Sequence, residues 1–211
     1  MQRLVTRLVQ NLRPVPPHVV PVRLLTGVAG GVAVSVAMVG IWLGYRPDML
    51  AAARTVMFWV KFAYGLAVGA LALWAVERLA RPGTEALSRI LWLLLPLAAV
   101  AALAASQIAR APARDRAPMV MGASASVCPL LVIASAGPPL MGLIWAVRGL
   151  APIRLRTAGA MIGLAAGGFG AGAYALHCTE WTAPFLAVWY SLGVAGCGVV
   201  GAALGPYVLK W

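Results

Sequence analysis

The amino-acid sequence predicts an all-α membrane protein, a bundle of six transmembrane helices. Hydrophobic residues make up 62% of the 211 residues and charged residues only 10%, which is more apolar surface than a soluble core of this size can bury. The apolar residues fall into long runs separated by short segments that contain most of the arginines. The alternation of polar and apolar residues that a membrane β-barrel needs is absent, so helices are expected to satisfy the backbone in lipid.

Residues 1–23 are expected to form a cytoplasmic N-terminal arm, separate from the transmembrane domain of residues 24–211. Apolar side chains recur there at helical spacing, and several prolines are expected to end any helix before the first span. Such an amphipathic arm either lies on lipid headgroups or docks a soluble partner. The apolar residues are Leu4, Val5, Leu8, Val9 and Leu12, opposite Arg3, Arg7 and Asn11, and the prolines are Pro14, Pro16, Pro17 and Pro21.

Six apolar runs follow the arm, each long enough for the roughly 20 residues of a spanning helix. Their short connectors predict antiparallel neighbours in one bundle. Glycines at four-residue intervals in the second, fifth and sixth runs indicate close helix packing, and Cys197 within such a stripe is expected to be a small buried residue. Prolines in the third and fourth runs are expected to kink or loosen those helices. The predicted spans are residues 24–43, 55–76, 88–108, 124–147, 157–177 and 183–205.

Lysine and arginine are unevenly distributed between the two sides of the predicted bundle. The arm, the second and fourth connectors and Lys210 hold most of them, whereas the first and third connectors hold few and the fifth none. Because basic short loops stay in the cytoplasm, both termini are expected there. This topology also explains the net charge of +12, and we expect no direct binding of nucleic acid.

Two cysteines are the strongest candidates for chemistry. Nearly a full hydrophobic thickness of helix separates Cys128 from Arg148, which places Cys128 near the outer surface if Arg148 marks the inner one. Cys178 ends the fifth predicted helix at that same outer surface. Two thiols at one depth in an oxidising compartment can form a disulfide, or bind a soft metal or a thiol-reactive toxicant. A permanent disulfide or a pair of inert buried thiols is the alternative.

His177 and Glu180 flank Cys178 and are expected to support the sensor site. Protonated His177 favours the thiolate and Glu180 opposes it. A metal site made by Cys128, Cys178 and His177 is a less favoured alternative, because the chain has only two histidines and His18 is predicted on the opposite side.

Lys61 is the one clear charge within a predicted span. It either pairs with a polar group in the bundle or, as we favour, snorkels to the surface. No phosphate-binding loop, Ser-His-Asp set or carboxylate pair is found in the sequence, so we expect neither an enzyme nor a bound cofactor.

Several segments together resemble the NrsF family, the negative regulators of sigma F. The similarity runs the length of the chain. It includes Tyr174-Ala-Leu-His-Cys-Thr-Glu, Pro184-Phe-Leu-Ala-Val-Trp-Tyr, Cys128, Arg148-Gly-Leu-Ala-Pro, Leu12-Arg-Pro-Val and Ala80-Arg-Pro-Gly.

The resemblance implies a six-span anti-sigma factor of the bacterial inner membrane. Such a protein holds an extracytoplasmic-function sigma factor inactive until a stress signal arrives, and the family's paired cysteines, which map onto Cys128 and Cys178, suggest thiol-based sensing. A protein with so little cytoplasmic mass can inhibit only through short segments, which are the arm and the connectors with residues 78–89 and 148–156. The expected contacts with the sigma factor are Leu8, Leu12 and Arg13 in the arm, and Arg148, Arg154 and Arg156 in the fourth connector.

Two other function classes stay open at this point. A small six-span transporter or channel would account for the spans and Lys61, but the chain has few intramembrane acids and no obvious duplicated halves. A membrane thiol oxidoreductase is disfavoured because no vicinal cysteine pair is present to exchange electrons.

Overall fold

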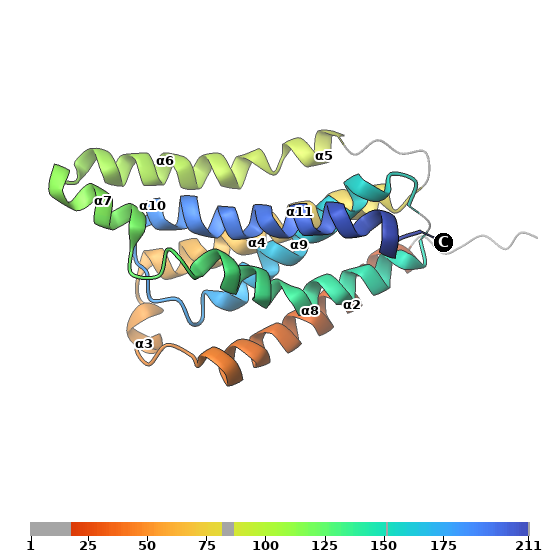
Figure 1. The fold of residues 1–211 in the computed structure, drawn as a ribbon, viewed down its shortest axis with the longest axis horizontal. Coiled ribbons are helices and arrows are strands. Elements are labelled where there is room, and N and C mark those ends of the chain that lie inside the picture. Colours follow the sequence, from red (N-terminus) through yellow and green to blue (C-terminus); the bar gives the residue numbers. More distant parts are fainter. Residues whose placement is uncertain (1–17, 82–86, 151, 211) are drawn as a thin grey trace, which may run out of the picture.

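The computed structural model describes residues 18–81, 87–150 and 152–210 of the chain (Figure 1). The described residues form helices and no strands, which confirms the predicted all-α class. The long helices are α2 (Val19–Met38), α4 (Val56–Leu79), α6 (Leu94–Arg110), α8 (Cys128–Arg148), α9 (Leu155–Tyr174) and α11 (Ser191–Val208). The shorter helices are α3 (Met49–Ala52), α5 (Leu87–Leu91), α7 (Ala113–Met121) and α10 (Ala183–Phe185), with π-helical turns η1 (Val39–Leu43) and η2 (Leu186–Tyr190).

Helix α9 is the centre of the bundle. It packs against α4, α8 and α11, and more lightly against α2, and most of its residues are buried. Glycines allow neighbouring helices to approach α9 closely on three sides. A Cβ atom on Gly163, Gly168 or Gly170 would collide with the backbone of α11, α4 or α8, respectively. The glycine stripes predicted to bring helices together therefore do so, and Cys197 is buried at the α9–α11 contact as expected.

Five helical segments of the described chain are long and apolar enough to cross a membrane, rather than the six predicted. The five are residues 19–43, 56–79, 88–110, 128–148 and 183–208. The predicted span that does not qualify is the fifth, which forms α9. Its many glycines add length to the helix without adding much apolar surface. Its neighbours cover it on most sides, so α9 does not depend on contact with lipid.

The N-terminal boundary of the helical bundle also differs from the prediction. Helix α2 begins at Val19 and includes Pro21 in its first turn, where the backbone N–H that proline lacks would have no acceptor within the helix. The expected arm contacts Leu8, Leu12 and Arg13 lie outside the described residues.

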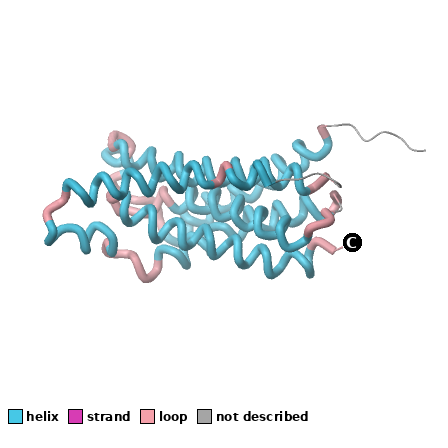
Figure 2. The backbone as a smooth tube through the Cα atoms, turned by 90° about the horizontal axis from the view of Figure 1, so that it is seen from above, coloured by secondary structure: helices cyan, strands magenta, loops and turns pink. Residues whose placement is uncertain are grey.

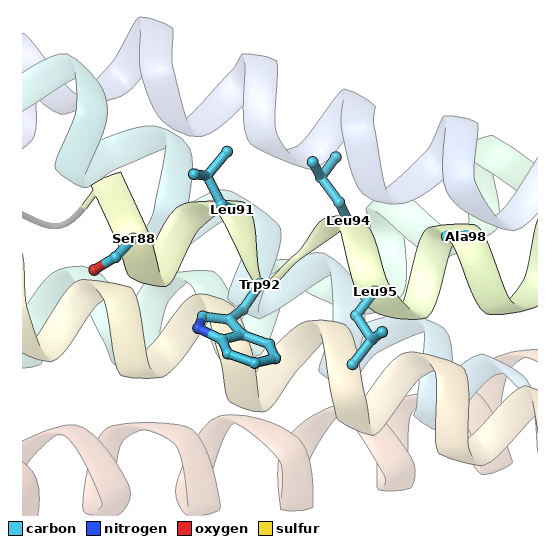
Figure 3. Close-up of a pocket in the computed structure, with 6 residues that line it drawn as sticks. All are labelled: Ser88, Leu91, Trp92, Leu94, Leu95 and Ala98. Carbon is cyan, nitrogen blue, oxygen red and sulfur yellow. The ribbon is translucent and has the colours of Figure 1, made fainter.

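Proline breaks the third predicted span but not the fourth. Residues 88–108 form two helices, α5 and α6, with Pro96 in the first turn of α6. Around this break Leu91 and Leu94 point to one side and Trp92 and Leu95 to the other (Figure 3). Helix α8, in contrast, continues through Pro138 and Pro139.

Loops gather at the two ends of the helices (Figure 2). We call the end formed by residues 44–55, 111–127 and 175–182 the thiol end, because Cys128 and Cys178 lie there. The opposite end, near the labelled C-terminus in Figure 1, contains the α8–α9 connector with Arg148, Arg154 and Arg156. We call it the arginine end.

Candidate functional site

Cys178 lies in the loop that follows α9. The helix ends at Tyr174, whose carbonyl accepts a hydrogen bond from the backbone N–H of Cys178 at 3.0 Å. The carbonyl of Cys178 is therefore free of the helix and accepts hydrogen bonds from two cations, Lys61 Nζ at 3.2 Å and Arg46 at 3.3 Å. The Cys178 side chain is almost fully buried, with 3% of the residue exposed.

Lys61 does not snorkel, which corrects our prediction. Only 1% of the residue is exposed, and Nζ lies 3.7 Å from the sulfur of Cys178 as well as 3.2 Å from its carbonyl oxygen. The lysine lies in the second turn of α4, directly under the loop after α9. This loop supplies a backbone acceptor inside the bundle, so the ammonium has a partner without reaching the surface.

Arg46 connects the loop after η1 to the loop after α9. Its guanidinium makes two hydrogen bonds with the Asp48 carboxylate, at 2.7 and 2.8 Å, and lies over the Trp181 ring at 4.9 Å. The hydrogen bond with Asp48 raises the pKa of Arg46 and lowers that of Asp48. The backbone N–H of Arg46 donates to the carbonyl of Leu176 at 3.1 Å, so both backbone and side chain hold these loops together.

Glu180 connects the same loop to the start of α8. One of its carboxylate oxygens accepts hydrogen bonds from the backbone N–H groups of Ala123 and Ser124 at 2.8 and 3.1 Å, and from the Ser124 hydroxyl at 2.9 Å. The carbonyl of Ser124 in turn accepts a hydrogen bond from the backbone N–H of Cys128 at 2.9 Å. This chain of contacts places both cysteines at the thiol end. Cys128 has no exposed surface, and the three cysteines are free thiols.

The alternative metal site is not formed. His177 points toward the loop after η1, where its Nδ1–H donates to the carbonyl of Gly44 at 2.8 Å. Among residues 18–81, 87–150 and 152–210, no three His, Cys, Asp or Glu side chains are grouped closely enough to hold a metal ion. The histidine thus fixes the loop geometry instead of joining Cys128 and Cys178.

A cavity of about 270 Å³ reaches Cys178 from the thiol end. Its wall combines apolar side chains with a cation and hydroxyl groups, so small polar molecules fit its chemistry. The lining residues are Leu43, Gly44, Tyr45, Arg46, Pro47, Ser124, Tyr174, His177, Cys178 and Thr179.

Tyr190, on η2, has a buried hydroxyl with no hydrogen-bond partner of standard geometry among the residues that the structure describes, and this group lies beside the Cys178 thiol. Arg46 and Tyr190 were not among the predicted site residues. One feature of the sequence could have drawn attention to Arg46, because the connector that contains it has few other charges. We used that charge only to predict the orientation of the helices.

The arginine end presents its cations to solvent. Arg148, Arg154 and Arg156 are all exposed, and the intervening Ile153 exposes 69% of its surface. Arg23 on α2 is held differently: it lies over the Trp145 ring at 5.1 Å and donates to the Trp145 carbonyl at 3.3 Å. The connector between α8 and α9 is therefore accessible while the helices beside it are fixed.

The fold and the apolar helices define the class of this protein as a helical bundle with five candidate membrane-spanning segments in its described part. Residues 8–211 match the model of the NrsF family, described as negative regulator of sigma F, and the chain belongs to this family. The anti-sigma-F factor NrsF of Caulobacter vibrioides is 38% identical over 205 residues, which cover 96% of this chain and 93% of that protein.

A second relative comes from Azospira oryzae and is named "Probable anti-sigma-F factor NrsF". It is 35% identical over 185 residues, which cover 88% of this chain and 85% of that protein. No solved structure matches the chain.

Proposed function

We propose that this protein is an anti-sigma factor of the bacterial inner membrane, with both termini in the cytoplasm. It sequesters an extracytoplasmic-function sigma factor at the arginine end. It releases that partner when an oxidant or a thiol-reactive metal modifies Cys128 or Cys178. The names of the two relatives support the sigma-factor partner, and the excess of arginine at one end supports the orientation.

The observation that carries the proposal is that one helical hairpin joins the two sites. Helix α8 begins at Cys128 and ends at Arg148, and α9 runs back to Tyr174, four residues before Cys178. A modification that changes packing at the thiol end therefore acts on both helices that hold the exposed connector. This is the physical link that coupling between two distant sites requires.

Magnitudes favour a covalent signal over a weakly bound one. Shifting a two-state equilibrium from almost wholly one state to almost wholly the other takes about 5.5 kcal/mol. A disulfide that closes a loop of about 50 residues is worth roughly 4 kcal/mol in chain entropy. Membrane helices are already restricted when unfolded, so this figure is an upper estimate, but it is still of the size needed to shift a two-state equilibrium strongly.

Co-purification tests the partner. The full chain in detergent is expected to retain a stoichiometric sigma factor, and loss of charge at Arg148, Arg154 and Arg156 together is expected to weaken that complex. Replacing Arg114 and Arg116, exposed arginines at the thiol end, is the matched control and is expected to leave it intact. If the complex survives the replacements at the arginine end but not those at the thiol end, the sigma factor binds at the thiol end and the proposed binding site is wrong.

A double replacement tests the trigger. Cys128→Ser with Cys178→Ser is expected to bind the sigma factor normally and to keep it when peroxide is added. Cys197→Ser removes a buried thiol away from the thiol end and is expected to release like the original protein. Normal release by the double variant would exclude thiol sensing while leaving the anti-sigma role in place.

A further inference from the structure

We propose that Cys178 is the thiol that reacts first, that Lys61 makes it reactive, and that small uncharged oxidants reach it through the cavity at the thiol end. The inference rests on the proposed thiol-sensing function and adds an order of events and a positioning residue to it. Four observations carry it: a buried ammonium, an unpartnered hydroxyl, the cavity, and the contrast with the other two cysteines.

The first observation is that the Lys61 ammonium is buried. A buried charge needs a partner of opposite charge, yet within the described part of the chain no carboxylate oxygen lies within ion-pair distance of Lys61. The group in contact with Nζ that can become an anion is the Cys178 sulfur, 3.7 Å away. Transfer of the thiol proton to Lys61 would give an ammonium beside a thiolate, which is the reactive form of the cysteine.

Two further groups favour the charged form of this pair. The Tyr190 hydroxyl is buried beside Cys178 without an acceptor of standard geometry, and a thiolate is such an acceptor. The Arg46 guanidinium hydrogen bonds to the Cys178 carbonyl at 3.3 Å, which places a second positive charge close to the sulfur. Both groups are held in place by the surrounding loops and helices, so no rearrangement is needed to stabilise the anion.

The cavity distinguishes Cys178 from the other two cysteines. Cys178 lines it, whereas neither Cys128 nor Cys197 does. Cys128 is fully buried beside Tyr174, and Cys197 packs against glycines of α9. Because reactivity requires both thiolate character and access, the structure assigns the first reaction to Cys178.

The reaction with hydrogen peroxide balances with these groups. The Cys178 thiolate attacks one peroxide oxygen, the O–O bond breaks, and a sulfenic acid forms on the sulfur. The other oxygen leaves as hydroxide and takes the proton of the Lys61 ammonium to become water. The sulfur loses two electrons and peroxide gains them, and Lys61 is left as a neutral amine under the modified sulfur.

This product explains how the signal starts. Before oxidation, an ammonium and a thiolate attract each other between α4 and the loop after α9. After oxidation, neither group is charged, and an added oxygen occupies space beside Tyr190. The loop that begins where α9 ends therefore loses its electrostatic attachment to α4.

Three single-cysteine proteins test the assignment. Each keeps one of Cys128, Cys178 and Cys197 with serine at the other two positions, and the full chain in detergent is treated with iodoacetamide or with peroxide and a sulfenic-acid trap. The Cys178-only protein is expected to react at least roughly tenfold faster than the others near neutral pH, since one pKa unit changes the thiolate fraction about tenfold. A Cys128-only protein that reacts as fast overturns the proposal.

Changes at Lys61 test its role in the Cys178-only protein. Lys61→Met removes the charge and is expected to lower the alkylation rate roughly tenfold and to make the rate rise more steeply with pH. Lys61→Arg keeps the charge and is expected to retain most of the rate. Equal rates for the methionine variant and the lysine protein overturn the proposal.

The pH profile of the Cys178-only protein provides a second test that needs no change at Lys61. The alkylation rate of the Cys178-only protein is expected to depend less steeply on pH than that of the Cys197-only protein, and an equal pH dependence overturns the assignment. Serine at position 128 removes one of the neighbouring titratable groups. The charged or titratable groups that remain near the sulfur are Lys61, Arg46, Tyr174, His177, Glu180 and Tyr190.

Sigma-factor binding separates failure of this inference from failure of the proposed function. The Lys61→Met protein with all cysteines present is expected to bind the sigma factor and to need more peroxide to release it. If it binds and releases at the same peroxide concentration as the original, the role of Lys61 is wrong and the anti-sigma function stands. If the original protein binds no sigma factor, the proposed function is wrong, whatever the alkylation rates show.

Discussion

Two serines at the contact between α2 and α8 are expected to respond oppositely to removal of their hydroxyls. In a regular helix the carbonyl of Ser135 would accept a hydrogen bond from the N–H of residue 139, but Pro139 has none. The Ser35 hydroxyl supplies the missing bond, donating to that carbonyl at 2.6 Å. The Ser135 hydroxyl itself is buried and has no hydrogen-bond partner in the described part of the chain.

The magnitudes follow from this difference. Ser35→Ala leaves a buried carbonyl without a donor, which costs about 1–3 kcal/mol in soluble proteins, whereas hydrogen bonds between membrane helices average roughly 0.6 kcal/mol and reach about 1.7. We therefore expect Ser35→Ala to lower the free energy of unfolding by about 1–2 kcal/mol. Ser135→Ala removes an unpaired polar group and is expected to be neutral or slightly stabilising.

Unfolding by sodium dodecyl sulfate in mixed micelles measures both effects. The eight tryptophans provide a fluorescence signal, and the two alanine variants are matched because each removes one buried serine hydroxyl from the same contact. An equal loss of stability for both variants would refute the reasoning, because it would show that packing volume, rather than the carbonyl freed by Pro139, decides the outcome.

Three further predictions concern other parts of the bundle. Gly163→Ala places a Cβ against the backbone of Cys197 and is expected to cost more than 2 kcal/mol in the same unfolding assay, whereas Gly30→Ala meets nothing within 4 Å and is expected to be neutral or better. Glu180→Ala removes three hydrogen bonds from the turn before α8 and is expected to increase hydrogen exchange there; unchanged exchange would contradict its anchoring role. Because the pKa of Asp48 is lowered in the folded protein, its stabilising effect is present at neutral pH and declines as the pH falls below the usual carboxyl range towards the lowered pKa. Asp48→Asn is therefore expected to destabilise the protein more at neutral pH than at acidic pH, and an equal difference at both would contradict this.

Much of the fold followed from the sequence because hydropathy and charge act along the chain. The predicted runs match α4, α8 and the continuous segment of α10, η2 and α11 to within about four residues at each end. The span between Cys128 and Arg148 correctly separated the two ends of the bundle. The same reasoning placed Cys178 at the depth of the start of α8, without its lateral distance from Cys128.

The rest depended on lateral packing, about which a single sequence says little. Lys61 snorkels or stays buried according to whether an acceptor lies over the first turns of α4, and that acceptor comes from the Cys178 carbonyl on a distant segment. Arg46 is likewise part of the site only because its loop folds onto the one after α9. The glycines of α9 indicated close contacts, but not that this helix would be central.

The central position of α9 has a consequence for how the protein is made. A segment so rich in glycine gains little on its own from entering lipid, so it cannot be expected to insert stably when it first leaves the ribosome. The packing site of α9 is complete only once α11, which follows it in the chain, has been synthesised. We therefore expect biogenesis to end with a late docking step, and chains that terminate early to be cleared by membrane proteases before they reach any partner.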